Sequence, residues 1–177
     1  MEQEPELQGR TPAAYHVFIN HRGPDVKKSL ASLIYHRLTN CHRLRVFLDQ
    51  NEIRTGDIIS NAILTAIQSA SLHITIFSKK YAESWWCLEE LYWILRSYHK
   101  RSRMVIPVFC DVEPADLRHT ESGCYKDAFD KHQLKGRVSM EVMEKWRKAL
   151  SEASEISGIT FKTEERFIHP LLISCRI

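Results

Sequence analysis

The sequence lacks the features that mark several large classes of protein. Its 177 residues include only 6 glycines and 6 prolines, which excludes collagen-like and low-complexity chains. Its longest apolar run is a few residues, far short of the roughly 20 that a membrane-spanning helix needs. The first ten residues are polar and include three glutamates, unlike a secretory signal peptide. We therefore expect an ordinary globular domain without a membrane anchor.

Charge and cysteine content narrow the choice further. Lysine and arginine total 25 and aspartate and glutamate 22, so the net charge is only +3, which is too small to favour a dedicated nucleic-acid-binding protein. The five cysteines are odd in number and form no C-x-x-C pair, so we expect a reducing compartment, namely the cytoplasm and also the nucleus. The nine histidines have no cysteine or glutamate at ligand spacing, so we expect no metal site.

Short apolar runs alternate with helical patterns along the chain. This alternation predicts an α/β fold, a flavodoxin-like three-layer sandwich with a central parallel sheet of about five strands and helices on both faces. We expect one loop over 49–57 and a second, long loop that contains Pro114 and Gly123 and lies between the strand at 104–109 and the helix at 125–132. We expect Pro107 at a sheet edge or a bulge, because it has no N–H to donate. The predicted strands are 15–19, 44–48, 72–77 and 104–109, and the predicted helices are about 26–39, 58–67, 85–98, 125–132 and 146–156.

The functional edge of such a sheet lies beyond the carboxyl ends of its strands. That rule places the loops after Ile19, Leu48, Phe77 and Phe109 there. In the first loop Arg22 can bind a phosphate or carboxylate with its forked guanidinium, and Gly23 lets the backbone approach a ligand, although an ordinary tight turn would look the same. The sequence has neither G-x-G-x-x-G nor a P-loop, which argues against a Rossmann dehydrogenase and a P-loop NTPase.

The helix predicted over 85–98 carries a second candidate feature. At 100° per residue its apolar residues form one core face, and Glu89 lies nearly opposite, in solvent. Glu90 lies at the flank, with Trp86 one turn earlier on the same side. A carboxylate beside an aromatic ring can lie at the lip of a cleft. The alternative is that Glu90 is a solvated helix residue and Trp86 lies at the edge of the core.

Taken together, these segments resemble the plant branch of the TIR (Toll/interleukin-1 receptor) domain. The resemblance covers about residues 14–158, and it is strongest from Tyr81 to Leu91, which matches a Trp-Cys-Leu-x-Glu-Leu box. We expect a lead-in over 1–13, a TIR domain over 14–160 and a tail over 161–177, that is, a TIR-only protein. The other matching segments are 15–25, 46–59, 105–118 and 123–129.

The resemblance implies an NAD⁺ nucleosidase of plant innate immunity, which cleaves NAD⁺ or NADP⁺ to nicotinamide and ADP-ribose or a cyclic ADP-ribose isomer. Such a protein is active on self-association through TIR–TIR contacts, also with other TIR proteins, and promotes immune signalling and cell death. NAD⁺ would be the substrate, so no cofactor is expected. By resemblance Glu90 is the catalytic residue, and Arg22, Gly23, Arg54 and Trp86 bind the substrate.

The chain departs from the family pattern at three positions. Ser32-Leu33 stands where many plant members carry Ser-His at a TIR–TIR interface, His21 replaces an aromatic residue, and Thr55 replaces a charged one. Two alternatives remain open. One is a non-catalytic TIR–TIR adaptor, and the other is a TIR domain that processes nucleic acid or forms cyclic nucleotides, which the net charge of +3 supports little.

Overall fold

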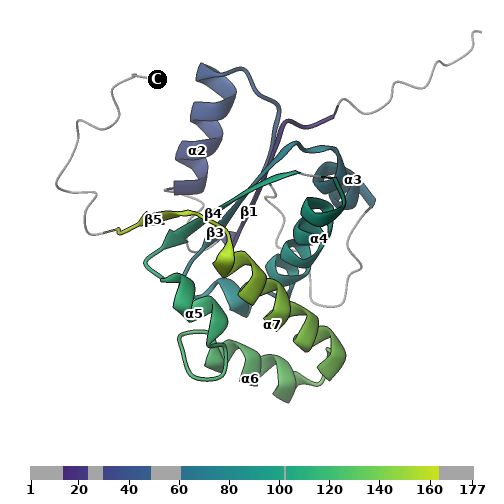
Figure 1. The fold of residues 1–177 in the computed structure, drawn as a ribbon, viewed down its shortest axis with the longest axis vertical. Helices are drawn as coiled ribbons and strands as arrows, with labels where there is room; N and C mark the ends of the chain where they lie inside the picture. Colours follow the sequence, from purple (N-terminus) through teal and green to yellow (C-terminus); the bar gives the residue numbers. More distant parts are fainter. Residues whose placement is uncertain (1–13, 24–29, 49–60, 102, 164–177) are drawn as a thin grey trace, which may run out of the picture.

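The computed structural model describes residues 14–23, 30–48, 61–101 and 103–163. In this part of the chain short strands alternate with helices, as the sequence predicts (Figure 1). The strands are β1 (Val17–His21), β2 (Val46–Leu48), β3 (Leu72–Phe77), β4 (Met104–Cys110) and β5 (Ile159–Phe161). The helices are α2 (Ser32–His36), η2 (Arg37–Cys41), α3 (Asn61–Ser69), η3 (Tyr81–Glu83), α4 (Trp85–Arg101), α5 (Pro114–Arg118), α6 (Lys126–Lys135) and α7 (Met140–Glu155).

The five strands form one parallel sheet in the order β2-β1-β3-β4-β5. The predicted fold class is therefore confirmed. From β1 the chain first adds β2 on one side and then adds β3 to β5 on the other, so the direction of winding reverses between β1 and β3. The crevice of such a sheet opens at this reversal, beyond the carboxyl ends of the two strands.

Alternate side chains of the strands bury the two faces of the sheet in separate cores. Val17 and Ile19 pack with α2 on one face, which Figure 1 shows covered by that helix. Phe18 points the other way and packs with α3 and the middle of α4. Further along this second face, Phe77 and Phe109 pack with α4, α6 and α7. Helix α4 therefore lies in both cores of the second face.

Two short elements were missed by the sequence analysis. Helix α5 lies where a loop was predicted, and it begins with Pro114 at its first turn and a reciprocal capping box between Glu113 and Asp116. Both signals were present in the sequence, but a five-residue helix is too short to show a 3.6-residue period. Strand β5 has only three residues, and it pairs with the end of β4 directly after α7.

Pro107 does not lie on an edge strand, because β4 is flanked by β3 and β5. The sheet tolerates a proline at this position for a different reason. The pairing with β5 begins only at Val108, and the Pro107 carbonyl oxygen faces Gly158, where a Cβ would lie 2.5 Å from it. A strand residue directs its N and its carbonyl to the same side, so the missing N–H of Pro107 faces the start of β5, before the ladder begins.

The sequence predicts one regular helix over about 26–39, whereas the structure has two helical types within the described part of this range. The described part begins at residue 30, and the regular helix α2 is followed by the π-helical turn η2. Leu33, in the Ser-Leu pair, is 43% exposed, so an apolar side chain faces outward where the family commonly has histidine. The use of this surface in self-association stays a prediction.

Candidate functional site

The site begins where α4 starts beside the carboxyl end of β1. Ser84 precedes the helix, and its hydroxyl accepts a hydrogen bond from the backbone N–H of Cys87 at 3.3 Å, as the sequence analysis expected for a cap. Leu88 and Leu91 on the next turns are fully buried, which fixes the rotation of the helix against the sheet. That rotation decides where the two glutamates that follow Leu88 lie.

Glu90 lies under the helix, against the end of β1, and is only 1% exposed, so it is neither at the lip of a cleft nor in solvent, the two positions that the sequence analysis considered. The side-chain amide of Asn20 donates a hydrogen bond from Nδ2 to Glu90 Oε2 at 2.6 Å. The same nitrogen lies 3.3 Å from the Cys87 carbonyl oxygen. Neighbouring positions on β1 and α4, 70 residues apart in sequence, thus place an amide donor on the candidate catalytic carboxylate.

Tyr81 fixes the orientation of the Asn20 amide. Its hydroxyl donates to Asn20 Oδ1 at 2.5 Å and lies 2.9 Å from the Cys87 carbonyl oxygen. Burial, together with the nearby Cys87 and Glu90, raises the pKa of Tyr81 well above its ordinary value, so the hydroxyl keeps its proton and acts as a donor. With its oxygen occupied by Tyr81, Asn20 directs its nitrogen to Glu90. The order Tyr81, Asn20, Glu90 is therefore a chain of directed hydrogen bonds.

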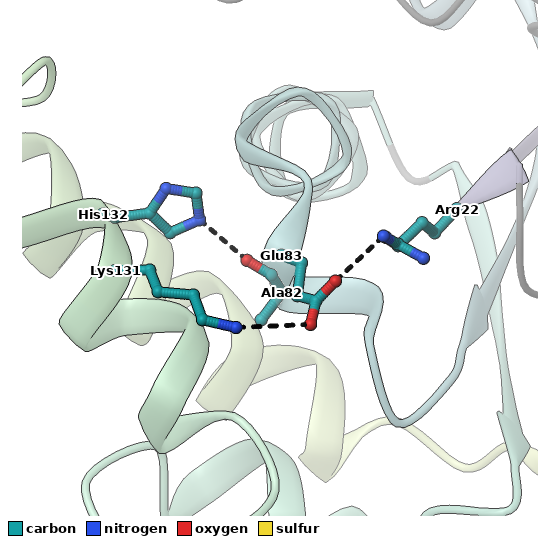
Figure 2. Close-up of polar contacts among 5 residues, drawn as sticks. All are labelled: Arg22, Ala82, Glu83, Lys131 and His132. Carbon is teal, nitrogen blue, oxygen red and sulfur yellow. Dashed lines mark hydrogen bonds and ion pairs between the residues drawn. The ribbon is translucent and has the colours of Figure 1, made fainter. Parts of the chain in front are cut away.

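Arg22 follows directly after β1, at the same edge of the sheet. Its Nη2 lies 2.9 Å from Glu83 Oε2 in the 3-10 turn η3, as Figure 2 shows. Lys131 of α6 approaches the other oxygen of Glu83 at 3.9 Å. The neighbouring His132 contacts the Ala82 carbonyl oxygen at 2.8 Å through Nε2. The turn η3 is thus bound on one side by the end of β1 and on the other by α6 (Figure 2).

The remaining predicted substrate-binding residues have different surroundings. Trp86 is 6% exposed and packs in the core with Phe18 and Ile94, so the structure gives it the position that the sequence analysis described as the alternative. Gly23 is half-buried directly after Arg22. Arg54 lies outside the described residues. The roles of all five predicted site residues stay predictions.

Glu89 does not lie in solvent, as the helical wheel had predicted. It is half-buried, and its carboxylate accepts hydrogen bonds from two indole N–H groups, those of Trp93 at 3.1 Å and Trp146 at 2.8 Å. The prediction was wrong because α7 packs beside α4 on that side and brings Trp146 with it. Trp93, four residues after Glu89, was the only signal in the local sequence, since such pairs face each other on a helix.

Two further features of the described residues bear on function. These residues contain no group of three or more histidine, cysteine, aspartate or glutamate side chains that could hold a metal ion. Among them there is also no helix with the length and apolar character needed to cross a membrane.

Comparison with protein-family models decides the family. The TIR domain model matches residues 14–173. The chain belongs to the TIR domain family. Among solved structures, the TIR domains of the activated Roq1 resistosome, which directly recognizes the pathogen effector XopQ, superpose with a TM-score of 0.72 at 34% identity. The match covers 84% of this chain and 88% of that one, which agrees with the sheet order and helix placement described above.

Similar curated proteins come from plants. TMV resistance protein N of Nicotiana glutinosa is 34% identical over 82% of this chain. The probable 2′ cyclic ADP-D-ribose synthase BdTIR of Brachypodium distachyon is 35% identical over 83% of it. Disease resistance protein RPP4 of Arabidopsis thaliana is 37% identical over 81%. The matched region spans 12% of the length of the first and third of these relatives and 59% of BdTIR.

Proposed function

We propose that this TIR domain is an NAD⁺ nucleosidase that acts in plant immune signalling and promotes cell death. It cleaves NAD⁺ to nicotinamide and ADP-ribose or a cyclic isomer of it. The observation that carries the proposal is the carboxylate of Glu90, which Asn20 holds at 2.6 Å at the functional edge of a TIR fold. The similarity to BdTIR, whose name gives a closely related product, and to three disease-resistance or resistosome proteins supports the same chemistry and setting.

The main catalytic group that this reaction requires is one carboxylate next to the ribose. Nicotinamide leaves as a neutral ring, so no general acid is needed, and the transition state resembles an oxocarbenium ion, as in glycoside hydrolysis. An ionised Glu90 next to the ribose stabilises that positive charge or binds the ribose hydroxyls. The amide of Asn20 donates a hydrogen bond to this carboxylate and holds it in one orientation.

The other predicted site residues have roles in binding. Arg22 and Arg54 hold the two phosphates through charge-assisted hydrogen bonds. Trp86, which is buried like Glu90, provides an aromatic surface beside the ribose and base only after the first turn of α4 has moved, and Gly23 leaves room for the backbone to approach. Attack by water then gives ADP-ribose, whereas attack by a group of the same molecule gives a cyclic isomer. NADP⁺ carries the same scissile bond and is a second possible substrate.

Burial of Glu90 leads to the regulatory part of the proposal. At 1% exposure the carboxylate cannot contact a ribose, so the first turns of α4 or the residues around them must move before reaction. We propose that self-association through TIR–TIR contacts supplies this movement. The specific activity should therefore rise with protein concentration. A specific activity that stays constant over a hundredfold range would contradict assembly control.

Incubation of the purified protein with NAD⁺, with free nicotinamide measured by chromatography, tests the central proposal. Glu90→Gln should lower the rate by at least about 100-fold, because the charge that stabilises the transition state is lost. Glu144→Gln, which removes an exposed carboxylate from α7, is the matched control and should retain the wild-type rate. Equal rates for the wild type and Glu90→Gln would remove the proposal.

A non-catalytic TIR–TIR adaptor is the second candidate, and the same burial of Glu90 favours it. In that case Glu90 is a structural partner of Asn20, and no concentration of protein releases nicotinamide. The NAD⁺ assay at high protein concentration separates the two candidates directly.

A further inference from the structure

A cavity of about 330 Å³ opens between the start of α4, the end of α6 and the start of α7. Glu89 lines it, whereas Glu90 does not. A volume of this size lies at the lower end of the range of small-molecule sites, about 300–1,000 Å³. The lining residues are Glu83, Trp85, Glu89, His132, Lys135, Arg137, Val138, Ser139, Val142 and Trp146.

The cavity has an aromatic interior and a cationic mouth. Trp146 is 1% exposed and His132 8%, so these rings close the inner end of the cavity, and the half-buried Trp85 beside them offers the accessible aromatic surface. Lys135 and Arg137 are exposed and lie at the opening. A ligand that fills this cavity therefore contacts aromatic surface inside it and positive charge at its opening.

The polar groups of the interior are hydrogen-bond acceptors. Each carboxylate oxygen of Glu89 accepts one indole N–H and keeps a further lone pair for another donor. Burial lowers the pKa of His132, so its ring is neutral. Nε2 then donates to the Ala82 carbonyl oxygen, which leaves Nδ1 as an acceptor. Acceptors in an aromatic cavity favour a planar ligand that carries an amino group.

The cations at the mouth favour an anion. Within the described part of the chain, neither Lys135 nor Arg137 forms an ion pair. The other acidic residue of the lining is Glu83, which is already bound by Arg22 and Lys131. A phosphate can satisfy both free cations at once, because it offers several charged oxygens.

We infer that this cavity is a binding site for a nucleoside monophosphate whose base carries an exocyclic amino group, such as adenosine monophosphate (AMP). The base lies against the half-buried Trp85, its amino group donates to Glu89, and its phosphate is bound by Lys135 and Arg137. The site is separate from the one proposed for NAD⁺, and it does not depend on turnover.

The four indole N–H signals of the ¹⁵N-labelled protein give a direct assay. The chain has four tryptophans, and three of them, Trp85, Trp93 and Trp146, lie in the cavity wall or bind Glu89. Trp86 does not line the cavity, but its ring touches that of Trp85, with centroids 5.3 Å apart, so it serves as the indirect reporter. Titration with AMP should shift the first three signals with saturation and shift the Trp86 signal less than that of Trp85.

Two related probes test the orientation of the ligand. Adenosine lacks the phosphate, and purine riboside monophosphate lacks the 6-amino group. Each should bind about tenfold more weakly than AMP, because each loses one set of charge-assisted hydrogen bonds. Equal affinity of AMP and adenosine, or of AMP and purine riboside monophosphate, would overturn the inference.

Variants assign the contacts. Lys135→Ala combined with Arg137→Ala should weaken AMP binding about tenfold or more and leave adenosine binding unchanged. Lys145→Ala combined with Lys148→Ala removes the same charge from α7 outside this cavity and should leave AMP affinity as it is. Absence of any saturable shift with AMP would also overturn the inference. Because no NAD⁺ is present, that result would leave the proposed nucleosidase untouched.

Discussion

Glu89 and Glu90 are neighbours on one helix, yet they lie in two different regions of the molecule. Glu90 faces the sheet, is 1% exposed and is bound by an amide from β1. Glu89 faces α7, is half-buried and is bound by two indoles at the wall of a cavity. Successive residues differ by about 100° around a helix, so two adjacent carboxylates can serve separate sites without any change in the backbone.

Glu89 and Glu90 are adjacent in sequence, but they differ strongly in burial and in the chemistry of their hydrogen-bond partners. The sheet side supplies a directed chain of hydrogen bonds to Glu90, which fixes one carboxylate in one orientation. The α7 side supplies N–H donors that are fixed by packing and leave lone pairs of Glu89 free for a ligand. Three changes, from the largest expected effect to the smallest, test this difference.

Asn20→Leu should cost the most stability. The change keeps a similar volume but removes the donor to a buried carboxylate, so the free energy of unfolding should fall by about 3 kcal/mol. Urea unfolding followed by circular dichroism measures it. In the Glu90→Leu background the same change should cost much less, because the Asn20–Glu90 hydrogen bond is already absent. An equal cost in both backgrounds would show that the Asn20–Glu90 bond contributes nothing.

Trp146→Phe should have a smaller effect on the other side of α4. It removes one of the two donors to Glu89 and part of a buried ring, so we expect a loss of about 2 kcal/mol in the free energy of unfolding. The remaining indole, that of Trp93, still binds the carboxylate. A loss as large as that of Asn20→Leu would contradict the claim that the two glutamates differ in how much they depend on their partners.

His132 should give the smallest effect, and it should depend on pH. Burial lowers its pKa from the ordinary value of 6.5, the hydrogen bond to the Ala82 carbonyl partly opposes this, and Lys135 and Glu83 have smaller effects that lower and raise the pKa, respectively. Below about pH 6.5 the unfolded chain binds a proton that the folded chain does not, so stability is present above that pH and falls as the pH falls. His132→Gln should flatten the pH dependence of the melting temperature between about pH 8 and pH 5. An unchanged slope would exclude His132 as its source.

Much of the architecture could be predicted because its signals are local. The run at 72–77, in which five of the six residues are apolar or β-forming, predicted β3 with its observed bounds. The start of α4 followed from Ser84 and the apolar spacing after it. Strand β5 has three residues and no alternation of its own, so only its pairing with β4 defines it.

The surroundings of the site could be predicted only in part, for a physical reason. A helical wheel measures angles around one helix, and it located the core face correctly. It contains nothing about which other elements pack beside that helix. Asn20 and Trp146 bind the adjacent glutamates from positions 70 and 57 residues away, and such distant partners have no signature in a local window. The ion pair of Arg22 with Glu83 was missed for the same reason.

The turn η3 lies between the two regions and belongs to both. Arg22, directly after β1, forms an ion pair with Glu83 of this turn. From the other side, Lys131 of α6 binds Glu83, and His132 of α6 binds the Ala82 carbonyl (Figure 2). Three residues restrained from opposite directions cannot move toward one neighbour without lengthening a bond to the other. A ligand in the cavity beside α6 is therefore mechanically connected to Arg22 through the single turn η3.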